Sequence, residues 1–140
     1  MSFTIEEFTI QAYDEMMALW RDSEGVGLSD ADSPKAISHY LARNPGMSFV
    51  AGMDGRIVGA VLCGHDGRRG YIHHLAVHRT CQRQGIGKAL AARCTEALES
   101  AGIQKCHIFI LNDNPDGRQF WDRIGWNFRT DIRVMSRILG

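Results

Sequence analysis

A glycine-containing turn between an apolar strand and an amphipathic helix is the feature that most constrains this chain. The turn is Gln82-Arg83-Gln84-Gly85-Ile86-Gly87-Lys88, and it follows the apolar run Leu75-Ala76-Val77. Because glycine lacks a Cβ atom, two glycines one residue apart let the backbone turn tightly and approach a ligand closely. The first amides of the following helix have no intrahelical partner and carry the positive end of the helix dipole. The pattern therefore predicts a strand, a turn and a helix that together can bind a phosphate or a pyrophosphate.

Length and charge narrow the class of protein. We expect the 140 residues to form one domain, 1–140, with a single sizeable core. The 16 basic and 16 acidic side chains give a formal net charge of zero, so no overall field favours nucleic acid. No apolar run approaches the roughly 20 residues that cross a membrane, and residues 1–7 lack the features of a secretory signal. We expect a cytoplasmic protein with neither nucleic acid nor membrane as a partner.

The cysteines and histidines do not suggest a metal site. The four cysteines contain no Cys-x-x-Cys pair, so we expect reduced thiols in the core rather than a zinc or redox motif. His73 and His74 are neighbours on a predicted strand and should point to opposite faces. We therefore expect no metal ion.

The spacing of apolar residues predicts the elements. Helices are predicted over 11–21, from Pro34 to just before Asn44, over 85–101, and between Asn114 and Gly125. Strands are predicted near 3–8, 48–53, 56–63, 70–78, 105–111, 126–130 and 132–139.

The connections predict the architecture. Asp54-Gly55 and Asp66-Gly67 lie between apolar runs, which is a strong signal for antiparallel hairpins. The helix over 85–101 forms a crossover, so strands 70–78 and 105–111 should be parallel. We predict an α/β (α+β) fold with a mixed, mostly antiparallel sheet of about seven strands and helices on both faces.

Two common phosphate-binding motifs do not fit the glycine turn. A dinucleotide motif requires a third small residue where this chain has Leu90, and an acidic residue in the region that here contains Lys105. A nucleoside-triphosphate loop requires glycine where Gln82 stands and serine or threonine where Ala89 stands.

Over essentially its whole length the chain resembles the GNAT superfamily of N-acetyltransferases. Residues 82–87 match that family's Gln/Arg-x-x-Gly-x-Gly/Ala motif, and residues 114–126 resemble its Asn-x-x-Ala-x-x-Phe-Tyr-x-x-x-Gly-Phe element. The resemblance implies that acetyl-CoA is the co-substrate, that turn amides hold its pyrophosphate, and that the preceding strand binds the pantetheine arm. The residues it implies for the coenzyme are Leu75, Ala76, Val77, Gln82, Arg83, Gln84, Gly85, Ile86, Gly87, Lys88, Asn114, Phe120 and Trp121.

The catalytic groups differ from the family pattern. The tyrosine that often protonates the departing thiolate is replaced by Trp121, and indole N–H is not a usable acid. Tyr71 and Phe109 stand on strands where some members place a glutamate base. Of the side chains on strand 70–78, His73 is our first choice as base and His74 our second, with a purely structural role as the alternative. A backbone N–H of Leu75–Val77 is the expected oxyanion donor.

Several functions remain open at this point. The main expectation is acetyl transfer to a primary amine, of a small molecule or a peptide, by direct attack in a ternary complex. Cys81 beside the turn has no assigned base to make it an acyl carrier. The alternatives are a non-catalytic acyl-CoA-binding module and an enzyme that uses a longer acyl-CoA. We expect the acceptor near the acidic loop 22–33 and the helix after it, and the family makes a homodimer possible.

Overall fold

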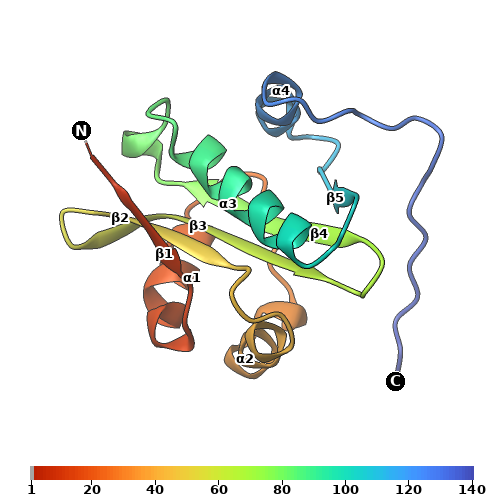
Figure 1. The fold of residues 1–140 in the computed structure, drawn as a ribbon, viewed down its shortest axis with the longest axis horizontal. Coiled ribbons are helices and arrows are strands. Elements are labelled where there is room, and N and C mark those ends of the chain that lie inside the picture. The colour runs from red at the N-terminus through yellow and green to blue at the C-terminus, as the bar shows by residue number, and fades with distance from the viewer. Residues whose placement is uncertain (1) are drawn as a thin grey trace. The chain divides into compact units, whose positions relative to one another are not determined.

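The computed structural model describes residues 2–140 (Figure 1). The chain divides into two compact units, a first unit up to Phe109 and a second unit from Ile110 onward. The first unit contains the whole sheet and three α-helices, and the second contains one α-helix followed by a segment without regular structure. The single domain expected over 1–140 stays a prediction.

Over the described residues 2–140, the sheet of the first unit has five strands. They are β1 (Thr4–Glu7), β2 (Phe49–Met53), β3 (Arg56–His65), β4 (Gly70–Val77) and β5 (Cys106–Ile108), in the spatial order β1-β2-β3-β4-β5. All neighbours are antiparallel except β4 and β5, which are parallel. The predicted hairpins and the parallel crossover are therefore confirmed.

Helices cover both faces of this sheet, as Figure 1 shows. On one face lie α1 (Tyr13–Arg21) and α2 (Pro34–Arg43), with the short 3-10 helices η1 (Ile10–Ala12) and η2 (Asp30–Asp32) before them. On the other face lies α3 (Ile86–Ser100), which leads from β4 to β5. The core on the α1 face is built around Trp20 and Met16, both fully buried, with Ile37 of α2.

Local sequence explains where the helices begin and end. The Ser33 hydroxyl accepts a hydrogen bond of 3.1 Å from the Ala36 amide, and Pro34 occupies the first turn of α2. The chain leaves α3 through Gly102, whose φ of 81° is in the left-handed region that glycine tolerates. These signals are as predicted from the sequence.

Two expectations about strands are wrong. The strand predicted over 105–111 is only Cys106–Ile108, and the strands predicted over 126–130 and 132–139 are absent, so the sheet has five strands instead of about seven. An alternating apolar pattern fits a strand, but a strand also needs a backbone partner. Over 126–140 no ladder to another strand forms, a bidentate ion pair at 2.8 Å joins Arg129 to the nearby Asp131, and large apolar side chains are exposed.

In the second unit, α4 (Pro115–Arg123) begins as predicted at Asn114. The Asn114 side chain accepts a hydrogen bond of 3.1 Å from the Gly117 amide. Trp121 is buried, and its ring packs edge-on against Trp126, with centroids 4.7 Å apart, and against Phe120, at 5.2 Å. The aromatic residues of this unit thus form its small core.

Candidate functional site

The glycine turn is open to solvent at the start of α3. Residues 82–85 are exposed, and Gly85 precedes the helix with φ 84° and ψ 6°. A Cβ atom at Gly85 would meet no other atom within 4 Å, so the space beside it is free. No side chain caps this helix terminus, and its first amides therefore remain available to an anion. Arg83, with φ 64°, adds a positive side chain in a strained left-handed conformation.

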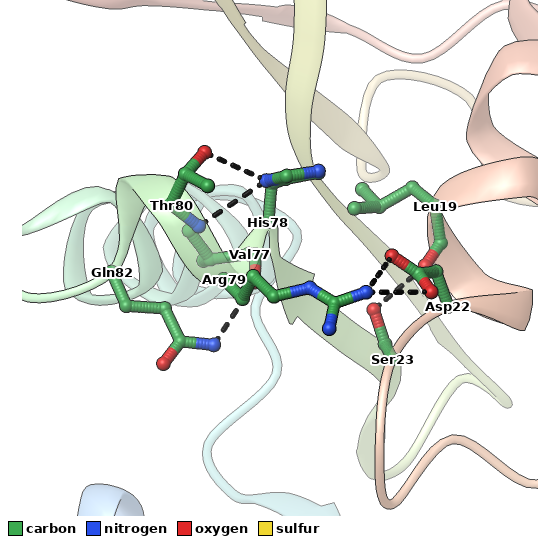
Figure 2. Close-up of polar contacts among 8 residues, drawn as sticks. All are labelled: Leu19, Asp22, Ser23, Val77, His78, Arg79, Thr80 and Gln82. Carbon is green, nitrogen blue, oxygen red and sulfur yellow. Dashed lines mark hydrogen bonds and ion pairs between the residues drawn. The ribbon is translucent and has the colours of Figure 1, made fainter.

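Side chains hold the segment that leads into the turn (Figure 2). His78 Nδ1 accepts a hydrogen bond of 3.2 Å from the Thr80 amide and so caps the 3-10 helix η3 (Arg79–Cys81). Gln82 Nε2 donates to the Val77 carbonyl at 3.2 Å. Nη2 of Arg79 donates to both carboxylate oxygens of Asp22, at 2.8 and 3.0 Å, and so joins this segment to the end of α1.

Strand β4 extends beyond its pairing with β5 toward the turn. Its pairing with β5 covers only Gly70, Tyr71 and Ile72, whereas β4 itself continues to Val77. Over the last five residues of β4 the sheet ladder runs only to β3. An extended chain of amides can add to such an edge as an extra strand does.

A β-bulge in β4 changes which side chains share a face. Leu62 of β3 pairs with His73 and Ala60 pairs with Ala76, so Val61 alone faces His74 and Leu75. His74 has φ 54°, in the left-handed region. The expectation that His73 and His74 point to opposite faces is therefore wrong. Their rings lie with centroids 6.4 Å apart, because the extra residue interrupts the two-residue alternation of the strand.

His73 belongs to a group of stacked rings. Its ring lies parallel to that of Tyr71, with centroids 6.4 Å apart and an interplanar angle of 6°. Tyr40 of α2 and Phe109 also pack against it, at 6.3 and 6.2 Å. Burial is the main reason that the pKa of His73 is lowered from 6.5, and the nearby His74 lowers it further. His73 is consequently a weaker base than an exposed histidine.

His74 is paired with a buried carboxylate. Its Nε2 atom lies 2.9 Å from Oδ1 of Asp32, and the two side chains are only 18% and 7% exposed. The His74 ring also packs edge-on against Trp20, with centroids 4.9 Å apart. Asp32 comes from η2, so this contact joins the 22–33 loop to the bulge in β4.

Two buried polar atoms lie near the histidines. Within residues 2–140, the Trp20 Nε1 and Tyr40 hydroxyl groups have no hydrogen-bond partner. Burial, with smaller contributions from nearby cysteines, raises the pKa of Tyr40. The Tyr40 hydroxyl therefore stays protonated at neutral pH and can donate a hydrogen bond, but it is a poor acid.

Other residues that the sequence singles out have local roles. Asn114, Phe120 and Trp121 belong to the second unit, where Asn114 caps α4. Asp66 accepts hydrogen bonds from the Arg68 and Arg69 amides, which lowers its pKa and makes it a turn residue. Over residues 2–140 no group of three or more potential ligands could hold a metal ion.

A shallow cavity of about 390 Å³ lies on the loop side of the His74–Asp32 pair. It is lined by α1 and by residues 28–33, including Tyr13, Met17 and Asp32. None of the glycine-turn residues lines it. This cavity lies in the region where an acceptor is expected from the sequence.

Sequence reasoning missed the partner of His74. Asp32 is one of four acids in the 22–33 loop, and 42 residues separate it from His74. The spacing Ser29-x-x-Asp32 does predict a capping box, which the structure contains. No residue type predicts the bulge, since the left-handed position is occupied by histidine rather than glycine.

Comparison with known proteins identifies the family. The sequence matches the family described as Acetyltransferase (GNAT) family over residues 13–126. An acetyltransferase of Sodalis glossinidius (strain morsitans) is 24% identical over 135 residues, which cover 96% of this chain and 94% of the relative.

Solved structures share the fold. The PaiA N-acetyltransferase from Thermoplasma acidophilum, in complex with coenzyme A, superimposes with a TM-score of 0.80 at 16% identity over 92% of each chain. AAC(6′)-Iy in complex with the bisubstrate analogue CoA-S-monomethyl-acetylneamine gives 0.79 at 15% identity over 100% of both chains. Within residues 2–140 no helix is long and apolar enough to cross a membrane. Because the family match covers most of its length, this chain belongs to the acetyltransferase (GNAT) family.

Proposed function

We propose that this acetyltransferase transfers the acetyl group of acetyl-CoA to a primary amine by direct attack in a ternary complex. The observation that supports this most is the combination of an uncapped, open start of α3 with a β4 edge that is unpaired with β5 beyond Ile72. An anion site and a strand-like site then follow one another along the chain, as the diphosphate and the amide-containing arm of coenzyme A require.

Coenzyme A would bind along this surface. The amides of residues 85–88 would donate to the diphosphate, with Gln82, Arg83, Gln84 and Lys88 beside it. The pantetheine arm would pair with Leu75, Ala76 and Val77. The family resemblance also assigns Asn114, Phe120 and Trp121 of the second unit to coenzyme binding. The PaiA N-acetyltransferase, a protein of similar fold, is described in complex with coenzyme A, which supports this assignment.

The reaction needs an unprotonated amine and a donor for the oxyanion. An alkylamine with a pKa near 10.4 is mostly protonated at pH 7, and deprotonation costs about 5 kcal/mol. His74, His73 and Tyr71 are the polar side chains of β4 nearest to Leu75–Val77, whose backbone N–H groups would stabilise the oxyanion. Because a thiol has a pKa of about 8.5, the thiolate can leave without a protein acid. The replacement of the family tyrosine by Trp121 is therefore tolerable.

The acceptor would approach from the face that carries α1 and α2. The cavity between α1 and residues 28–33 lies on that face. Two acids of the loop are already paired, Asp22 with Arg79 and Asp32 with His74, so fewer free charges remain to attract a cation than the sequence suggests. AAC(6′)-Iy is described with an acetylneamine analogue, and we include an aminoglycoside among the acceptors to test.

Two measurements test the proposal. Calorimetry with coenzyme A should detect binding, and acetyl-CoA turnover, followed as free thiol, should appear with some member of a panel that contains an aminoglycoside, a polyamine, amino acids and short peptides. Binding without turnover across the panel would favour a non-catalytic binding module. Faster turnover of propionyl- or succinyl-CoA would favour a longer acyl donor. No binding at millimolar coenzyme A would refute the proposal.

A further inference from the structure

Resting on the proposed function, we propose that Asp32 is a positioning residue, which fixes His74 in the tautomer whose Nδ1 atom accepts the proton of the attacking amine. The sequence favours His73 as the base. The geometry favours His74, because it alone of the two has a carboxylate on its far ring nitrogen.

The Asp32 carboxylate is held from both sides. Its Oδ2 atom accepts a hydrogen bond of 3.0 Å from the Ser29 amide, within the capping box of η2. Its Oδ1 atom faces Nε2 of His74 at 2.9 Å. The Tyr13 hydroxyl donates to the Asp32 carbonyl, which ties the same residue to α1. The carboxylate therefore has little freedom to turn away from His74.

This arrangement determines which nitrogen of His74 carries the proton. An ionised carboxylate only accepts hydrogen bonds, so Nε2 must donate to it. In the neutral ring Nδ1 then keeps its lone pair. Within residues 2–140 Nδ1 of His74 has no hydrogen-bond partner, and the edge-on contact with Trp20 restricts the ring.

The bulge places this base next to the proposed acyl site. His74 directly precedes Leu75–Val77, on the part of β4 that β5 no longer covers. Its left-handed φ of 54° brings the ring to the α1 face, toward Asp32 and the cavity by α1. The left-handed conformation is strained for a residue other than glycine, so the surrounding structure must hold His74 in it.

The proton balance is simple. The free amine attacks the thioester carbon, and a C–N bond forms. The nitrogen loses its extra proton to Nδ1 of His74, and Asp32 stabilises the resulting imidazolium through the Nε2–H bond. The C–S bond then breaks, and the thiolate leaves with the electron pair and takes a proton from the imidazolium or from solvent.

The Asp32→Asn variant tests the tautomer directly. Asparagine has only one acceptor oxygen, and the Ser29 amide can only donate, so the oxygen should face Ser29. The NH₂ group should then face His74 Nε2 and force that atom to accept. The proton moves to Nδ1, and the base is lost, although shape and capping are kept. We expect kcat to fall about 100-fold or more, with little change in KM for acetyl-CoA.

Matched variants separate this effect from others. Asp30→Asn removes the same charge from an exposed residue of the same 3-10 helix. If the loss of kcat in Asp32→Asn comes from the tautomer of His74 and not from the charge of the loop, Asp30→Asn should change kcat less than about threefold. His74→Asn keeps a residue that tolerates the left-handed conformation and should lose as much activity as Asp32→Asn. His74→Gly should regain part of its activity with added imidazole.

A spectroscopic measurement does not depend on the acceptor. Nitrogen-15 NMR of the imidazole rings should show the Nε2–H tautomer for His74 in the wild type and the Nδ1–H tautomer in Asp32→Asn. An Nδ1–H tautomer in the wild type would overturn the role of Asp32. So would full activity of Asp32→Asn or of His74→Asn under conditions in which the wild type is active. A wild type that shows the expected tautomer but binds no coenzyme A would instead refute the proposed function.

Discussion

Replacing Gly85 with alanine tests whether the glycine turn binds the diphosphate. Gly85 has φ 84° and precedes α3, and an L-residue there costs roughly 1–2 kcal/mol of stability. A Cβ atom would meet no atom of the protein within 4 Å, so no steric cost adds to this figure. The methyl group would occupy only the space that a ligand needs.

The loss of coenzyme A affinity can be estimated separately. If the methyl group prevents one hydrogen bond from a turn amide to a charged phosphate oxygen, about 1.5–3 kcal/mol of binding is lost. That range corresponds to a rise in Kd of roughly 10- to 150-fold. The folded fraction of the variant hardly changes with the modest loss of stability. A rise in Kd of this size would therefore report the loss of the phosphate contact.

Gly102→Ala is the matched control. Gly102 follows the other end of α3, has φ 81°, and also has no atom within 4 Å of an added Cβ. Both variants should lose similar stability in chemical denaturation, whereas only Gly85→Ala should lose affinity in calorimetry with coenzyme A. Equal affinities of the two variants and the wild type would refute the assignment of the diphosphate to this turn.

Three further substitutions test other contacts. Burial lowers the pKa of His73 below 6.5. As the pH falls through 6.5, His73 of the unfolded chain is therefore protonated first, and the free energy of unfolding decreases. His73→Phe should reduce this decrease, measured by urea unfolding above and below pH 6.5. Arg79→Ala should cost at most about 1 kcal/mol of unfolding free energy, because its pair with Asp22 is exposed; a loss well above that in denaturant titration would contradict us. Gly59→Ala would put a Cβ atom 3.1 Å from Ile86 Cγ2. By displacing the start of α3 it should lower the free energy of unfolding by about 1–3 kcal/mol, and an unchanged melting temperature would contradict this prediction.

Most of the fold is predictable because its signals are local. Asp54-Gly55 closes a hairpin, Ser33 and Asn114 cap helices, and Gly102 ends one, each within a few residues of its effect. The two C-terminal strands rest on periodicity alone. A strand depends on a partner far along the chain, and the apolar alternation of 126–139 does not specify one.

The candidate site divides in the same way. The glycine turn can be located from the sequence. Its backbone needs a left-handed residue, and glycine, the residue that adopts this conformation most easily, stands there as Gly85. The contact between Asp32 and His74 cannot be located in this way, since it depends on the register of β4 against β3 and on a bulge at a non-glycine residue. The preference for His73 followed from regular alternation, which that bulge interrupts.

The bulge in β4 also separates the strand into two segments of opposite parity. Up to His73 the odd-numbered side chains share the sheet face of Leu62, whereas beyond the bulge Ala76 lies on that face. Removing His74 would therefore restore an uninterrupted ladder. All remaining side chains of the strand would stay on their present faces. The removal of His74 would also leave the buried Asp32 carboxylate without its imidazole partner, so the inserted residue and the 3-10 helix η2 depend on each other.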